Sequence, residues 1–222
     1  RDLRRFLDDR LRLRKLIEAA DVAYDRPQRQ IDRWALPTRR NKRVHSKQRA
    51  ALEEQVRQAR ESLPKGVAMK VAHFGVGVGR FVELYRGDEV VGLDTTVWVA
   101  EQAAFSFEWP RFIVVGPGRR SALPSAAWDL AVVTHLVAAE PPERRRALIQ
   151  EMSRITRPGG RLVILDDVCG GKGIDTRTLV EEVVDVTGGS VTLVDTAALR
   201  YEEAGRIDDG VIALMSVGGR RG

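Results

Sequence analysis

The sequence is poor in cysteine and has no long apolar run. Cys169 is the single cysteine among 222 residues, which excludes an intramolecular disulfide and a cysteine-based zinc site. The longest uncharged apolar run, Leu130 to Ala139, falls well short of the roughly 20 residues that a membrane-spanning helix needs. Residues 1–20 alternate charges with leucine and so lack the apolar stretch of a signal peptide. We therefore expect a cytoplasmic protein without a membrane segment or a metal site.

Positive charge is concentrated in the first third of the chain. The formal net charge is +6, yet residues 1–66 hold 19 Lys and Arg against 10 Asp and Glu, and the remainder is slightly acidic. Between Arg33 and Arg49 there are seven basic residues and no acid. Such a block can attract a nucleic acid, an acidic protein or a phosphorylated ligand, or it can be a solvated surface. Trp34 is its one aromatic residue, whereas surfaces that stack nucleic-acid bases usually carry several.

The pattern of the chain changes near residue 66. Residues 3–23 carry leucines at helical spacing, Pro27 and Pro37 indicate a loop over residues 25–45, and Ser46 is a plausible N-cap for a second helix that ends near Leu63. We therefore predict a basic, helical N-terminal extension over residues 1–66.

From residue 67 onward, strand-like and helix-like segments alternate. Continuous apolar strands separated by helices indicate an α/β fold, a parallel sheet covered on both faces. The last two strands have no helix-length connection between them, so they should pair antiparallel. The predicted strands are 67–74, 89–93, 111–115, 128–134, 161–165, 191–195 and 211–217, and the predicted helices are 80–86, 96–105, 142–156 and 176–186.

A glycine-rich turn follows the first of these strands. Gly75, Gly77 and Gly79 alternate there, which lets the backbone approach a ligand closely. The spacing differs from the G-x-G-x-x-G of nicotinamide-binding proteins, because Arg80 stands where their last glycine would be. Asp94 ends the next strand, where a carboxylate can accept both hydroxyls of an adenosine ribose, or can act simply as a turn or N-cap residue.

These segments, in this order, resemble class I S-adenosylmethionine-dependent methyltransferases. The resemblance extends over residues 67–217, and its most specific part is the Pro158-Gly159-Gly160 turn that leads into the fifth strand. It implies a Rossmann-like, doubly wound, seven-stranded sheet with an antiparallel last strand. It also implies an S-adenosylmethionine-binding domain over residues 67–222. The other matching segments are the glycine turn, Val90–Asp94, Trp128–His135 and Pro142–Ile155.

The resemblance also implies roles for individual residues. The three glycines would hold the methionine and ribose parts of S-adenosylmethionine, Asp94 the ribose, and Thr95 would lie near the adenine. Thr134 and His135 would border the methyl group, and His135 is the candidate catalytic base. Because alignment of the acceptor with the methyl group supplies most of the catalysis, the chemistry does not require a protein base.

Two positions depart from the family pattern. His73 stands where the family usually has Asp or Glu, and the stretch around Gly116 lacks the acid that often reaches the adenine amine. We still predict both as cofactor contacts, the second through a backbone carbonyl. The departures also favour a second interpretation, a catalytically degenerate methyltransferase fold that serves as a binding or scaffold subunit.

We predict an S-adenosylmethionine-dependent methyltransferase that acts on a small or carrier-bound acceptor. An RNA methyltransferase that uses the segment from Arg33 to Arg49 and the scaffold subunit are the alternatives. An acidic protein is another possible partner of that segment. The sequence does not specify the oligomeric state.

Overall fold

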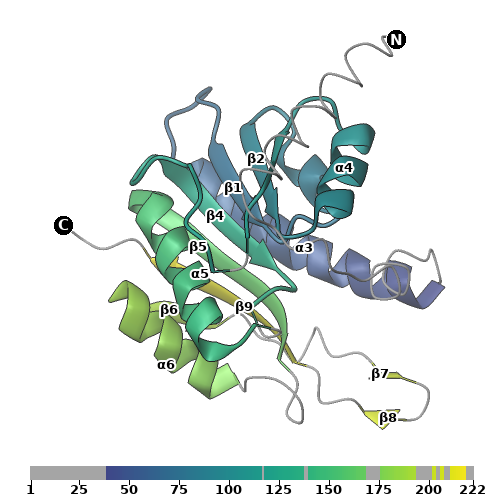
Figure 1. Cartoon of the computed structure of the whole chain (residues 1–222), viewed down its shortest axis with the longest axis vertical. Coiled ribbons are helices and arrows are strands. Elements are labelled where there is room, and N and C mark those ends of the chain that lie inside the picture. Colours follow the sequence, from purple (N-terminus) through teal and green to yellow (C-terminus); the bar gives the residue numbers. More distant parts are fainter. Residues whose placement is uncertain are drawn as a thin grey trace.

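The computed structural model describes residues 39–116, 118–137, 140–168, 176–193, 202–203, 206–207 and 211–218. Their centre is a seven-stranded sheet with the order β3-β2-β1-β4-β5-β9-β6 (Figure 1). The predicted helix over residues 3–23 and Cys169 lie outside the described residues. The strands of the sheet are β1 (Lys70–Phe74), β2 (Glu89–Asp94), β3 (Arg111–Val114), β4 (Trp128–Thr134), β5 (Thr156–Val168), β6 (Val191–Leu193) and β9 (Val211–Gly218). The helices are α3 (Arg39–Glu61), the 3₁₀ helix η1 (Val82–Tyr85), α4 (Val97–Ser106), α5 (Pro142–Ile155) and α6 (Thr176–Thr187).

Strand directions follow the connections between the elements. Strands β1 to β5 are mutually parallel, each linked to the next by a crossover on a face of the sheet. Strand β9 runs antiparallel to both of its neighbours, β5 and β6. A small separate hairpin joins β7 (Glu202–Glu203) to β8 (Arg206–Ile207). The predicted α/β, Rossmann-like class, with its parallel sheet, is confirmed.

Helices cover both faces of the sheet and bury two apolar cores. Helices α5 and α6 lie on one face, in front of the sheet in Figure 1, and α3 lies on the other. Alternate side chains of one strand enter different cores, as in β1, where Ala72 packs toward α5 and Val71 toward α3. The continuous apolar strands of the sequence therefore reflect burial on both sides.

The helix predicted over residues 80–86 is only a single 3₁₀ turn, η1. Gly79 and Gly87 both adopt left-handed backbone conformations, with φ of 87° and 91°, and they bound the stretch. Of the seven residues between them, only Val82–Tyr85 have a helical conformation, and Asp88 then leads into β2. This prediction was therefore wrong in extent.

Helix α3 begins at Arg39, not at Ser46. The helix starts two residues after Pro37, and the arginines and lysines that follow are favourable helix formers. The predicted loop over residues 25–45 and the predicted N-cap at Ser46 were therefore wrong from residue 39 onward. The part of the basic block that begins at Arg39 has a helical backbone, and Arg33 lies outside the described residues.

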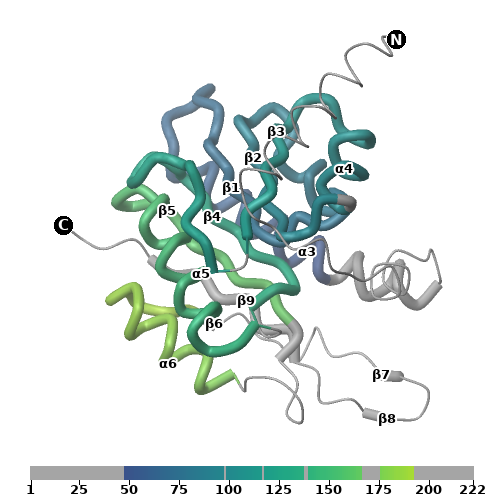
Figure 2. Tube along the Cα trace, viewed as in Figure 1, coloured from purple at the N-terminus to yellow at the C-terminus, as the bar shows by residue number. Residues whose placement is uncertain are grey.

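One side of α3 belongs to the core of the sheet. Leu52, Val56 and Ala59 are buried against Met69 of the following turn and against η1. The end of the helix is fixed as well, since Arg60 pairs with the Asp88 carboxylate at 2.5 Å. Thus the end of the predicted N-terminal extension packs into the predicted methyltransferase-like domain. In Figure 2 the coloured part of α3 lies behind the sheet.

Helix α5 also fixes the loop that joins β3 to β4. The Glu151 carboxylate accepts hydrogen bonds from the backbone N–H of Ser121 at 2.9 Å and from its hydroxyl at 2.5 Å. Arg154, one turn later, pairs with Glu151 and donates to the Leu123 carbonyl at 2.8 Å. Backbone groups of the loop are therefore bonded by side chains of the helix, as buried polar groups require.

Replacing Leu52 with Ala should destabilise the whole domain, because this side chain is completely buried between α3 and the sheet. We expect the free energy of unfolding to fall by about 2–5 kcal/mol, as for other large-to-small core substitutions. Urea unfolding followed by circular dichroism measures it. The exposed neighbour substitution Glu53→Ala is the control and should change stability by less than about 0.5 kcal/mol. Equal stability of the two variants would show that α3 is separable from the domain.

Candidate functional site

A cleft of about 420 Å³ opens at the carboxyl ends of β1, β2 and β3. Ligands of parallel α/β sheets bind at this edge. Its walls are largely apolar and its charged members are two acids and two arginines. The lining residues are Phe74, Gly75, Leu93, Asp94, Thr95, Val115, Gly116, Gly118, Arg119, Leu136, Glu140, Arg144 and Leu148. Of the predicted cofactor contacts, four lie here, namely Gly75, Asp94, Thr95 and Gly116.

The glycine turn requires glycine for different reasons at each position. All three glycines have positive φ, between 57° and 87°. A Cβ atom on Gly75 would lie 2.6 Å from the Thr134 carbonyl oxygen, and one on Gly79 would overlap the Phe107 ring. At Gly77 a Cβ would meet nothing within 4 Å, so there the requirement is conformational. Only Gly75 lines the cleft, while Gly77 and Gly79 shape the turn behind it.

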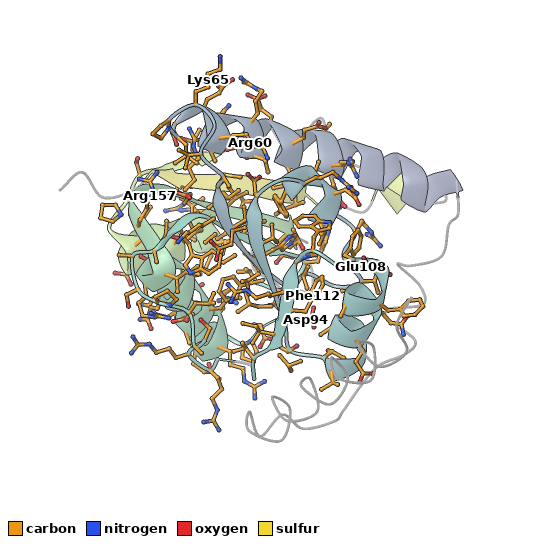
Figure 3. The ribbon with its side chains drawn as sticks, turned by 90° about the horizontal axis from the view of Figure 1, so that it is seen from above. Arg60, Lys65, Asp94, Glu108, Phe112 and Arg157 are labelled. Atoms are coloured by element: carbon orange, nitrogen blue, oxygen red, sulfur yellow. The ribbon has the colours of Figure 1, made fainter. Side chains whose placement is uncertain are left out.

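Asp94 connects the glycine turn to the cleft. Its Oδ2 accepts the backbone N–H of Gly77 at 3.0 Å and its Oδ1 accepts that of Thr96 at 2.9 Å. The Thr95 N–H and the Thr96 hydroxyl also donate to this carboxylate, so the hydroxyls of a ligand would share its oxygens with donors of the protein. Burial raises the pKa of Asp94, and the N–H donors oppose that rise. In Figure 3 Asp94 is labelled next to Phe112, on the side of the molecule away from Arg60 of α3.

His73 lies beneath the glycine turn and is completely buried. Its Nε2 is 3.0 Å from the Thr134 hydroxyl, and its Nδ1 is 3.1 Å from the Tyr85 hydroxyl. The Thr134 hydroxyl donates to the Gly75 carbonyl at 3.0 Å, and a carbonyl can only accept. It follows that Nε2 of His73 donates to Thr134, and that Nδ1 accepts from Tyr85. One directed chain of hydrogen bonds thus runs from Tyr85 to the carbonyl of Gly75.

This arrangement corrects the predicted position of His73. The imidazole does not line the cleft, because both ring nitrogens are used in the interior and the ring stacks near Phe81, with centroids 6.4 Å apart. Burial lowers the pKa of His73 to about 3, and the nearby His135 contributes to that decrease. His73 is therefore neutral at physiological pH. It positions the glycine turn from below, as does Thr134, which is also buried and absent from the cleft lining.

His135, the predicted base, occupies an unusual backbone conformation at the end of β4. Its φ is 53°, a left-handed value that is uncommon for a residue with a side chain. Its backbone N–H donates to the Leu165 carbonyl at 2.9 Å, which holds this conformation against β5. The residue is half-buried, and Leu136 rather than His135 lines the cleft. The structure thus places His135 next to the cleft but not in its wall.

The sequence analysis missed the charged side chains at the far end of the cleft. Glu140 comes from the loop between β4 and α5, Arg144 from the first turn of α5, and Arg119 from the loop after β3. Burial raises the pKa of Glu140, and Arg144 opposes that rise. The sequence does show that these three residues follow strands whose carboxyl ends form the edge of the cleft. Their sequence neighbourhoods, however, do not distinguish them from other charged surface residues.

Two further features of the described residues bear on the site. Within the described ranges, no three His, Cys, Asp or Glu side chains gather in a way that could hold a metal ion. Among the helices that the structure describes, none has both the length and the apolar character needed to cross a bilayer.

In the variant His73→Gln, the free energy of unfolding should decrease less as the pH is lowered than it does in the wild type. A histidine whose folded pKa is about 3 and whose unfolded pKa is near 6.5 binds a proton only on unfolding between these values. Its contribution is therefore complete above about pH 6.5 and is lost as the pH falls toward 3. We expect the wild type to lose about 1.4 kcal/mol per pH unit more than the variant between pH 6 and 4. Urea unfolding at several pH values tests this, and parallel pH profiles would contradict it.

A family model described as "Methyltransferase domain" matches residues 72–164 of the chain. The matched segment begins inside β1 and ends inside β5, so it contains most of the cleft. No match was found among curated protein sequences.

Several solved structures share the fold at low sequence identity. Magnesium protoporphyrin IX methyltransferase (ChlM) from Synechocystis PCC 6803, with bound SAM, has a TM-score of 0.65 at 14% identity, over 92% of this chain and 97% of that one. The CurJ carbon methyltransferase has a TM-score of 0.62 at 13% identity, over 77% of this chain and 54% of that one. A TehB-like SAM-dependent methyltransferase from Corynebacterium glutamicum has a TM-score of 0.57 at 19% identity, over 76% and 87%. The chain thus spans about half the length of the CurJ structure.

Proposed function

We propose that the cleft binds S-adenosylmethionine and that the protein methylates a small or carrier-bound acceptor, because a methyltransferase-domain model matches residues 72–164 and the fold is shared with S-adenosylmethionine-dependent methyltransferases. The observation that carries the proposal is the hydrogen bond from the Gly77 N–H to Asp94. It joins the glycine turn and the carboxylate at the end of β2 into one rigid edge of the cleft. A glycine turn and a ribose-binding acid are the two parts that an adenosyl ligand needs.

The residues present fit such a ligand. The largely apolar walls of the cleft suit a purine base. Asp94 lies in the cleft lining at the end of β2, where its carboxylate can accept a hydrogen bond from a ribose hydroxyl. Thr95 and the backbone at Gly116 lie beside it in the lining, in accord with their predicted roles. When bound, S-adenosylmethionine supplies an electrophilic methyl group on a sulfonium.

The protein's contribution to transfer is positional. The chain of hydrogen bonds from Tyr85 through His73 and Thr134 fixes the carbonyl of Gly75 at the cleft edge. Because His73 has no free ring nitrogen, it cannot accept a proton from an acceptor. If a protein base acts, we propose His135, which lies beside the cleft at the end of β4. Holding the acceptor in line with the methyl group accounts for most of the rate increase in this kind of reaction.

The proposal of a small or carrier-bound acceptor draws on the similar structures. They include, by their titles, a magnesium protoporphyrin IX methyltransferase and the CMeT domain of the citrinin polyketide synthase, the latter with a TM-score of 0.60 at 17% identity over 76% of this chain and 51% of that one. Both titles name methyltransferases without a nucleic-acid acceptor. An RNA acceptor bound by the basic segment from Arg33 to Arg49 is the alternative that the experiment must separate.

Replacing Asp94 with Ala should weaken binding of S-adenosylhomocysteine, because the ribose hydroxyls lose a charged acceptor. We expect a loss of roughly 1–3 kcal/mol, or about 5- to 150-fold in the dissociation constant. Isothermal titration calorimetry measures it, with thermal melts to confirm folding. The exposed acid Glu143 lies outside the cleft lining, so Glu143→Ala is the control and should bind as the wild type does. Absence of wild-type binding at millimolar ligand would reject the enzyme and favour the scaffold subunit.

Labelled methyl transfer into a cell extract should identify the class of acceptor. With radiolabelled S-adenosylmethionine, we expect the label in the small-molecule fraction or on protein through an alkali-labile link, as for a carrier-bound intermediate. The variant with Arg39, Arg40, Lys42 and Arg43 replaced by Gln should lower the labelling if this block contacts an anionic acceptor. Label in RNA, with a steep decrease as salt increases, would instead support the RNA methyltransferase.

A further inference from the structure

Glu140 is a cleft carboxylate without a hydrogen-bonding partner among the described residues. Its side chain is 16% exposed, and the nearest cation, Nη1 of Arg144, is 4.0 Å from Oε2. That distance is too long for a hydrogen bond. The carboxylate lines the cleft, so a ligand bound there can supply the hydrogen-bond donor that the described protein residues do not. The raised pKa of Glu140 agrees with this shortage of donors.

The backbone of Glu140, in contrast, is firmly held. Its N–H donates to the Val137 carbonyl at 3.3 Å, and its own carbonyl accepts from Nη1 of Arg145 at 3.1 Å. Arg145 is buried and pairs with Glu182 of α6 at 2.5 Å. The backbone of Glu140 is therefore anchored to α5 through Arg145, and the carboxylate is presented to the cleft from this anchored position.

The cleft thus contains two carboxylates at different places in its lining. Asp94 lies at the end of β2, and Glu140 lies at the start of α5, with the apolar side chains of Val115 and Leu136 also in the wall. In an adenosine the donors are the ribose hydroxyls and the exocyclic amine of the base. If Asp94 takes the hydroxyls, the amine is the donor that remains for a second carboxylate. The loop after β3, where the sequence lacks an acid, borders the same cleft through Gly116.

We propose that Glu140 recognises the adenine base by accepting a hydrogen bond from its exocyclic amine, and so replaces the acid that is missing after β3. This inference rests on the proposed function, because it assumes an adenosyl ligand at Asp94. The acid comes from the segment between β4 and α5, beside Arg144, which in turn lies against Gly118 of the loop after β3. It makes Glu140 the residue that distinguishes adenine from bases that carry an oxo group at that position.

The test compares S-adenosylhomocysteine with S-inosylhomocysteine, in which an oxo group replaces the amine. The wild type should bind the adenosyl ligand about ten- to a hundredfold more tightly, as expected for one charge-assisted hydrogen bond. In Glu140→Gln the side-chain amide can either accept from the amine or donate to the oxo group. The preference should therefore fall to within about threefold. Calorimetry on the full chain measures each dissociation constant.

Two further variants sharpen the comparison. Glu143→Gln removes the same charge three residues away, at an exposed position of α5, and should keep the wild-type preference. The variant Glu140→Asp keeps the charge but has a shorter side chain. If the carboxylate hydrogen-bonds to the amine, this variant should bind the adenosyl ligand more weakly than the wild type. Unchanged affinity would contradict a direct hydrogen bond. Thermal melts of all variants confirm that they fold.

The outcomes separate this inference from the proposed function. An unchanged preference in Glu140→Gln, with wild-type binding intact, would overturn the role of Glu140 alone. A loss of affinity for S-adenosylhomocysteine without a loss for 5′-methylthioadenosine, which lacks the amino acid part, would overturn it by assigning the carboxylate to the ligand's ammonium. A wild type that binds none of these nucleosides would overturn both.

Discussion

At the carboxyl end of β1 the backbone passes so close to β4 that no side chain fits. A Cβ on Gly75 would lie 2.6 Å from the carbonyl oxygen of Thr134, and the φ of 64° excludes most other residues there. The same close approach lets the Thr134 hydroxyl reach the Gly75 carbonyl. Contact between two neighbouring strands therefore sets the path of the turn, and the turn in turn sets where Asp94 and the cleft can be.

The site is supported from below by neutral hydrogen bonds, at the position where the resemblance led us to expect an acid. His73 connects the hydroxyls of Tyr85 and Thr134 in the apolar interior, and burial keeps it uncharged. A carboxylate in the same surroundings would need donors that the Tyr85 and Thr134 hydroxyls could provide only by changing their present partners. A neutral histidine thus suits the buried hydroxyls around it, and the glycine turn and Asp94 are both present above it.

Much of the fold was predictable because burial on both faces leaves a strong pattern. The continuous apolar strands predicted the parallel sheet and the alternate glycines predicted the turn, and Asp94, Thr95 and Gly116 do line the cleft. The position of His73 was not predictable, because its partners lie 12 and 61 residues away in the sequence. Glu140 was missed for a similar reason. A single acid in a loop has no periodicity, and only the folded chain brings it into the same cleft as Asp94.

The bonds between α5 and the β3–β4 loop bear on how the cleft could open. Glu151 and Arg154 satisfy backbone groups of the loop at Ser121 and Leu123, so freeing the loop exposes buried polar groups unless the helix moves with it. Helix and loop therefore form one cooperative unfolding unit. Because α5 also contributes Arg144 to the cleft wall, partial unfolding of this unit would remove two sides of the cleft together. Protection of the Ser121 amide from hydrogen exchange would accordingly rise and fall with the protection of the amides of α5.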